Sequence, residues 1–169
     1  MLYIFGGLPG TGKTTLARHL ATQVQAVHLR IDTIEQALRD TGSLVSGAEG
    51  YVVAYRLAAD NLRLGLDVIA DSVNAIEVTR TAWKEVAKTA GTPFLEIEVI
   101  CSNEPEHRKR VETRLSDIEA FPMPTWHEIK SRTYEPWDAD IVIDTAGQTL
   151  DTSVAALEQA LANRNRFKV

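Results

Sequence analysis

The stretch LYIFGGLPGTGKTT, which runs from Leu2 to Thr15, decides the fold of this chain. Its first four residues are an apolar run that stops at two glycines, which is typical of a buried strand followed by a turn. Apolar residues then recur with helical spacing at Leu16, Leu20 and Val24. We therefore expect a strand, a glycine-rich turn and a helix in immediate succession.

The turn matches the pattern GxxxxGK[ST] residue for residue. Glycines let the backbone turn tightly and point successive N–H groups at phosphate oxygens, and the helix N-terminus adds a positive dipole end. A glycine-rich turn with a surface lysine is the alternative, and four constrained positions make a chance match rare. The residues predicted to bind the nucleotide are Gly7, Gly10, Thr11, Gly12, Lys13, Thr14 and Thr15.

The rest of the chain alternates short apolar runs with helical periodicities. Strands are expected at 27–31, 67–71, 94–101 and 141–143. Helices are expected at 33–40, 52–66, 76–87, 111–118 and 150–161, and a capping box predicts a short helix that begins at Thr125. This alternation indicates βαβ units, and hence an α/β fold with a parallel sheet and helices on both faces.

Length and composition exclude several classes of protein. The 169 residues are the size of one domain, and 44% hydrophobic with 24% charged residues argues against a disordered chain. The single cysteine, Cys101, excludes an intrachain disulfide. No apolar run approaches the roughly 20 residues that span a bilayer. The opening residues have no basic segment, so we expect no signal peptide and a cytoplasmic location.

The charge balance restricts the partners of the chain. There are 18 Lys and Arg against 23 Asp and Glu, which gives a formal net charge of −5. An acidic domain has no electrostatic footprint for long duplex nucleic acid. A local site can still oppose the global charge and bind a small anion.

The sequence LPGTGKTTLA from Leu8 to Ala17 resembles the P-loop NTPase superfamily, in particular the small P-loop kinases grouped as AAA-type kinase domains. Chloramphenicol phosphotransferase, polynucleotide 5′-hydroxyl kinase, shikimate kinase and adenylylsulfate kinase are similar in this respect. The resemblance covers nearly the whole chain in the order of elements and is specific at the loop. It implies a three-layer fold with a five-stranded parallel sheet in the order 2-3-1-4-5. It also implies an ATP·Mg²⁺ site and an arginine-bearing lid at about 104–137 of a single domain, 1–169.

Lys13 and Asp32 are the first two candidate catalytic residues. Lys13 would reach the β- and γ-phosphates of ATP. Asp32 follows the second expected strand, and ligands of open α/β sheets bind beyond the carboxyl ends of the strands. Related kinases carry an aspartate there, which implies that Asp32 orients or deprotonates the acceptor hydroxyl. The alternative is a helix N-cap, because Asp32 and Glu35 have the spacing of a capping box.

Thr14 and Asp71 are the candidate ligands of Mg²⁺. The Thr14 hydroxyl belongs to the phosphate loop, and Asp71 ends the apolar run VIAD. A carboxylate at a strand end beside that loop can hold Mg²⁺, usually through water. Related kinases carry an aspartate at the end of the third strand, which supports this assignment. The alternative for Asp71 is a loop or capping carboxylate.

Arg110 and Arg114 are the remaining catalytic candidates. They are spaced i, i+4 and would share a helix face, from which two guanidinium groups could clamp the transferring phosphate. Related kinases show an Arg-x-x-x-Arg here, where the lid begins. The alternative is a solvated face paired with Glu106 and Glu112.

These parts together indicate an ATP-dependent phosphotransferase that moves the γ-phosphoryl group to a hydroxyl of a small-molecule acceptor, as a monomer or homodimer. For an anionic acceptor, Arg56 and Arg63 are further candidates to line the pocket. The alternatives are a polynucleotide 5′-hydroxyl kinase and a nucleotide-binding ATPase without an acceptor. A GTPase switch is not expected, because the base-reading motif Asn-Lys-x-Asp is absent from the sequence.

Overall fold

The computed structural model describes residues 1–166 and alternates strands with helices in this range. The strands are β1 (Leu2–Gly6), β2 (Val27–Arg30), β3 (Val68–Asp71), β4 (Phe94–Ile100) and β5 (Ile141–Asp144). The helices are α1 (Lys13–Val24), α2 (Ile31–Asp40), α3 (Glu49–Arg63), α4 (Glu77–Thr89), α5 (Glu104–Thr113), α6 (Trp126–Ser131) and α7 (Leu150–Arg166). Within this range, no helix is long and apolar enough to cross a membrane.

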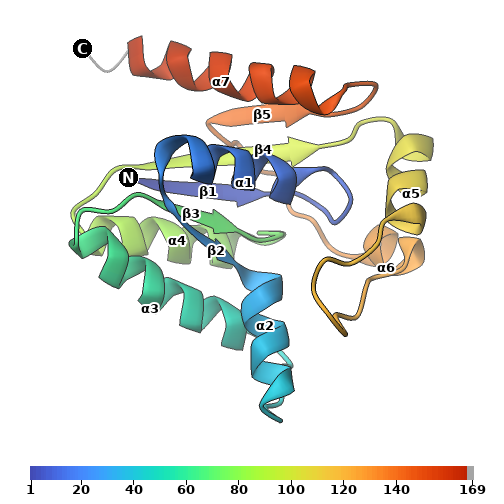
Figure 1. The fold of residues 1–169 in the computed structure, drawn as a ribbon, viewed down its shortest axis with the longest axis horizontal. Coiled ribbons are helices and arrows are strands. Elements are labelled where there is room, and N and C mark those ends of the chain that lie inside the picture. The colour runs from blue at the N-terminus through green and yellow to red at the C-terminus, as the bar shows by residue number, and fades with distance from the viewer. Residues whose placement is uncertain (167–169) are drawn as a thin grey trace.

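The five strands form one parallel sheet in the order β2-β3-β1-β4-β5, which confirms the predicted fold class and strand order (Figure 1). Asp71 at the end of β3 is in register with Phe5 on one neighbour and with Arg30 on the other. The chain therefore leaves β1, β2 and β3 at the same edge of the sheet. Ligands bind at this carboxyl edge in open parallel sheets.

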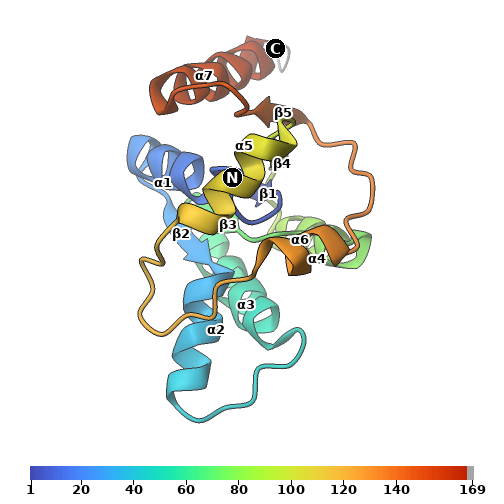
Figure 2. The same cartoon turned by 90° about the vertical axis from the view of Figure 1, so that its right-hand side faces the viewer.

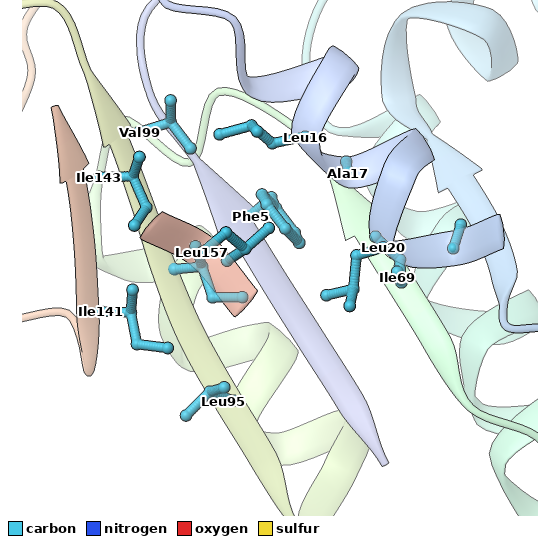
Figure 3. Packing of buried hydrophobic residues seen from close by; sticks show 12 residues of the cluster. Phe5, Leu16, Ala17, Leu20, Ile69, Leu95, Val99, Ile141, Ile143 and Leu157 are labelled. Carbon is cyan, nitrogen blue, oxygen red and sulfur yellow. The ribbon is translucent and has the colours of Figure 1, made fainter. Parts of the chain in front are cut away.

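Two apolar clusters hold the layers together. On one face, α1 and α7 pack on the sheet, and Figure 3 shows Phe5, Leu16 and Leu157 meeting between them. On the other face, α3 and α4 pack on Leu2 and Ile4 (Figure 2). Burying each such side chain contributes about 1.5–3 kcal/mol to folding, so the sheet is a rigid base for the segments at its edge.

The buried face of α3 differs from the predicted one. In the predicted helix over 52–66, Val52, Tyr55, Ala59, Leu62 and Leu66 recur with helical spacing, which predicts that Val52 is on the buried face, but Val52 is 43% exposed. Residues with small side chains are buried instead, at Gly50, Ala54 and Ala58, together with Leu62. Small side chains let a helix lie close to its neighbour, and a search for large apolar residues does not detect such a face.

The predicted helix over 111–118 is also partly wrong. Helix α5 already begins at Glu104 and ends at Thr113, and Arg114 caps it in an extended conformation with ψ 146°. Because the chain leaves the helix here, Leu115 does not share the face of Val111 and is 93% exposed. The predicted capping box at Thr125 is present and starts α6.

The predicted lid segment (104–137) lies at the carboxyl edge of the sheet, where α5 and α6 stand beside the ends of the strands (Figure 1). Its far end is fixed to the protein by the buried side chain of Arg80. The guanidinium donates hydrogen bonds to the carbonyl oxygens of Glu135 and Pro136, each at 2.8 Å, and lies over the ring of Trp137. The segment therefore has one firmly held end.

Candidate active site

The glycine-rich loop after β1 is bent as the phosphate-binding pattern requires. Gly10 and Gly12 have φ of +89° and +92°, in the left-handed region that favours glycine. Thr11 is buried, and its hydroxyl donates to the carbonyl oxygen of Leu8 at 3.0 Å. The hydroxyl of Thr145 donates to the carbonyl oxygen of Thr11 at 2.9 Å. Protein contacts thus hold the loop in this shape.

The N-terminus of α1 differs from the N-termini of the other helices. Among the helices that the structure describes, α2 to α7 each carry an acidic residue in the first turn, whereas α1 carries none and has no side-chain cap. First-turn N–H groups have no intrahelical acceptor, and the helix dipole favours a negative charge there. This end of α1 therefore suits a phosphate group.

A cavity of about 660 Å³ opens beside this loop. Its walls come from the loop, from α1, α2 and the start of α3, and from the part of the predicted lid segment between 110 and 132. Seven cationic side chains line it: Lys13, Arg18, Arg30, Arg39, Arg110, Arg114 and Arg132. Four acidic side chains also line it, so the cavity carries a local excess of three positive charges in a chain of net charge −5.

Lys13 and Asp71 form a buried ion pair at the edge of this cavity. The Nζ of Lys13 lies 3.3 Å from Oδ1 of Asp71, and Nε2 of His28 lies 3.2 Å from Oδ2. Burial alone would raise the pKa of Asp71, but the Lys13 ammonium and His28 outweigh it and hold the pKa below its usual range. Asp71 is thus ionised and its side chain is fully buried.

The same carboxylate fits the predicted Mg²⁺ site. The Oδ1 atom of Asp71 is buried and has no hydrogen-bond donor with good geometry among the described residues. Mg²⁺ prefers oxygen ligands and keeps several waters and phosphate oxygens when it binds a protein. The hydroxyl of Thr14 and the Oδ1 atom of Asp71, which faces the Lys13 ammonium without a hydrogen bond of good geometry, are the kind of ligands that such an ion needs.

Asp32 lines the cavity and does not cap α2, so the N-cap interpretation is wrong. Helix α2 begins at Ile31, with Arg30 as its N-cap, and no side chain caps it. Asp32 lies in the first turn with its Oδ2 3.6 Å from Nη2 of Arg30. Its carboxylate is one-third exposed and is open to a ligand in the cavity.

Arg110 and Arg114 both line the cavity, and Arg114 is the C-cap of α5, where its N–H donates to the carbonyl oxygen of Arg110 at 3.1 Å. Arg110 is held by its neighbours: it donates to the hydroxyl and the carbonyl oxygen of Thr145 and to Glu106. Burial lowers the pKa of Arg114, Arg30 lowers it further, and Asp32 opposes this change. The charges of Arg30 and Asp32 therefore influence Arg114, and all three side chains line the same cavity.

Not every predicted residue reaches the cavity. Gly10, Gly12, Lys13, Thr14 and Thr15 line it, whereas Gly7 and Thr11 do not. A Cβ on Gly7 would lie 2.1 Å from the carbonyl oxygen of Val99, so this glycine allows the loop to pass close to β4. Arg56 and Arg63 do not line it either.

Three arginines that the sequence pattern did not indicate also line the cavity, Arg18, Arg30 and Arg39. One signal for Arg39 was available. Asp32, Glu35 and Arg39 are spaced i, i+3, i+7, which places them on one face of a helix that starts at the carboxyl end of a strand. The other two are isolated arginines whose role depends on the lid segment folding over them.

Residues 2–136 match the AAA domain family. A relative from Aeropyrum pernix, named Probable adenylyl-sulfate kinase, is 28% identical over 160 residues, which are 89% of this chain and 86% of that protein.

Two solved structures share the fold. A gluconokinase from Sinorhizobium meliloti is 14% identical with a TM-score of 0.69, over 98% of this chain and 94% of that one. The APS kinase of Mycobacterium tuberculosis, solved in complex with AMPPNP and APS, is 16% identical with a TM-score of 0.67, over 95% of this chain and 96% of that one. Since the family match covers most of the chain and the sheet has the same architecture, this chain belongs to the AAA domain family and has the P-loop kinase fold.

Proposed function

We propose that this protein is a kinase that transfers the γ-phosphoryl group of ATP to a hydroxyl group of a small molecule. The observation that carries the proposal is a single cavity lined both by the glycine-rich loop and by Asp32, whose carboxylate does not cap α2. The adenylyl-sulfate kinase name of the relative and the gluconokinase name of the structural neighbour support a small acceptor.

In this proposal the chain holds the triphosphate with its backbone. The N–H groups around Gly10 and Gly12 and in the first turn of α1 point at phosphate oxygens. Lys13, which is paired with Asp71, would face the terminal phosphates, and Thr14 with Asp71 would hold Mg²⁺. When bound, Mg²⁺ neutralises phosphate charge and helps to orient the chain of phosphates.

Asp32 would accept the proton of the acceptor hydroxyl. The acceptor oxygen then forms a bond to the γ-phosphorus, the bond to the oxygen that bridges the β- and γ-phosphates breaks, and ADP leaves with that electron pair. Arg110 and Arg114 would stabilise the charge on the transferring group from the lid side. Phosphoryl transfer needs chiefly such positioning and charge stabilisation.

The test combines nucleotide binding with an acceptor screen. We expect AMPPNP with Mg²⁺ to raise the melting temperature of the protein, and Lys13→Ala to abolish this shift. A screen of small hydroxyl compounds and 5′-hydroxyl oligonucleotides with γ-labelled ATP should label a small molecule. Label on the oligonucleotides alone would favour a polynucleotide 5′-hydroxyl kinase, and hydrolysis of ATP without any labelled acceptor would favour an ATPase.

A further inference from the structure

Three guanidinium groups in the cavity have nitrogens without an acceptor. The Nε atoms of Arg30 and Arg114 and the Nη1 atom of Arg39 are buried and have no hydrogen-bond partner in the part of the chain that the structure describes. A buried donor without an acceptor costs about 1–3 kcal/mol, and more for a charged group. All three arginines line the same cavity, so one bound ligand could satisfy them together.

Arg39 lies away from the phosphate loop. It is seven residues after Asp32 on α2, which is about 10 Å along the helix axis. Its Nη2 donates to Glu35 at 3.2 Å, and burial raises the pKa of Glu35 despite that bond. Glu35 therefore satisfies one nitrogen of the Arg39 guanidinium, and the Nη1 atom stays without an acceptor among the described residues. A nucleotide bound by the phosphate loop does not account for an arginine on this turn of α2.

The predicted lid segment contributes an apolar wall beside Arg39. The guanidinium carbon of Arg39 lies 5.9 Å from the centroid of the Phe121 ring. Phe121, Met123 and Tyr51 line the same cavity. The wall is thus built from α3 and from the segment between α5 and α6, which passes beside α2 (Figure 2). A ligand bound at Arg39 would contact Tyr51 of α3 on one side and the lid segment with Phe121 on the other.

We propose that the acceptor is an anionic hydroxyl compound, whose phosphate, sulfate or carboxylate group is bound by Arg39 together with Arg30 and Arg114 while its hydroxyl faces Asp32. This inference rests on the proposed kinase function and names its substrate class. Guanidinium groups bind oxyanions through charge-assisted and often paired hydrogen bonds, which the unpaired nitrogens are placed to donate.

The test measures oxyanion binding with the nucleotide site filled. The protein is saturated with AMPPNP and Mg²⁺ and titrated with inorganic phosphate, and binding is followed through the ¹⁵N shifts of the arginine Nε–H groups. We expect saturable binding that moves the Arg30 and Arg114 signals. Arg39→Gln should weaken it about 10-fold, and Arg39→Lys should weaken it less. Arg63→Gln, an exposed arginine on α3 outside the cavity, is the matched control and should leave it unchanged.

Competition with inorganic phosphate then identifies which anionic group the arginines prefer. Gluconate tests a carboxylate, glycerol 3-phosphate a phosphate ester and inorganic sulfate a sulfate, and glucose is the neutral comparison. Displacement of phosphate by at least one anion but not by glucose supports the proposal. No phosphate binding, equal binding by Arg39→Gln, or displacement by glucose overturns it. The AMPPNP titration comes first. Failure to bind AMPPNP would overturn the kinase proposal, whereas failure to bind phosphate afterwards would overturn only the proposal about the acceptor.

Discussion

The ammonium group of Lys13 lies 3.3 Å from the carboxylate of Asp71, and the two side chains are 9% and 0% exposed. This pair joins the phosphate loop to the end of β3 across a water-poor interior. Removing one partner of a buried pair leaves the other charge uncompensated, which costs about 3–5 kcal/mol.

Lys13→Met is therefore expected to lower the free energy of unfolding by about 3 kcal/mol as well as to abolish nucleotide binding. The double variant Lys13→Met with Asp71→Asn should regain much of this stability, because no unpaired charge remains, and should still fail to bind nucleotide. Urea denaturation and AMPPNP titration check both parts. Equal stability of the single and double variants would contradict the role of this pair.

The same pair predicts a pH dependence. The pKa of Asp71 is lowered in the folded state, so its contribution to stability is present above the unfolded pKa and is lost as the pH falls through the folded value. In Lys13→Met the ammonium that lowers this pKa most is gone while His28 remains, so the folded pKa of Asp71 rises toward the unfolded value. The variant should then lose less stability than the parent protein on acidification from neutral pH, as urea curves at several pH values would show.

Asp32→Asn tests the catalytic proposal without disturbing α2. Because Asp32 caps nothing, we expect a melting temperature and AMPPNP affinity close to those of the parent protein. Loss of the proton acceptor should lower kcat about 10²–10⁴-fold. Thr33→Ala, an exposed change in the same turn, is the control and should keep its activity. Full activity of Asp32→Asn would remove it from the mechanism.

Asp117 links the predicted lid segment to the protein. Its carboxylate accepts a hydrogen bond from Nη1 of Arg30 at 2.9 Å and pairs with Arg18. The hydrogen bond from Arg30 lowers the pKa of Asp117 to about 2; burial opposes this shift, and Arg18 adds to it. The link is therefore intact above about pH 4 and is lost as the pH falls toward 2.

Asp117→Asn should speed amide hydrogen exchange in residues 114–121 with little change in global stability, since exposed ion pairs contribute about 0–1 kcal/mol. Hydrogen exchange with mass spectrometry checks this. Asp138→Asn, an exposed carboxylate in the same part of the chain, is the control. Unchanged exchange would mean that the ion pairs do not hold the segment in place.

Arg80 fixes the other end of that segment, and it is 3% exposed. Its guanidinium donates to four carbonyl oxygens, those of Asn74, Ala75, Glu135 and Pro136. Arg80→Ala removes this donor from all four carbonyls, of which Ala75 keeps the N–H of Glu135, so we expect a loss of about 3 kcal/mol or more in urea denaturation. Lys88→Ala, an exposed change on α4, should have little effect. A small effect of Arg80→Ala would show that other contacts hold this end.

The sequence predicts the parts of the fold that depend on local pattern. The run before Gly6, the glycine positions of the loop and the helix after Lys13 are local features, and the structure has all of them. The strand order followed from a family resemblance, not from periodicity. Residues in the walls of the cavity were harder to predict. Arg30 and Phe121 are distant in sequence, and only the folded lid segment places both in one cavity.

The positions of helix ends explain two other differences. The predicted helix over 111–118 ends at Thr113, so Leu115 does not share the face of Val111. The early start of α2 removes Asp32 from the N-cap position that its spacing with Glu35 indicates. In both cases the local spacing suits the prediction, but tertiary contacts decide where a helix begins or ends.

The positively charged lining of the cavity lies inside an acidic molecule, and this makes the protein a filter for solute size. A long polyanion meets the repulsive exterior before any of its charges reach the arginines, whereas a compact, highly charged solute enters and experiences the attractive field at close range. The association rate of such a solute falls as ionic strength rises, because added salt screens the attraction in the solvent outside the cavity.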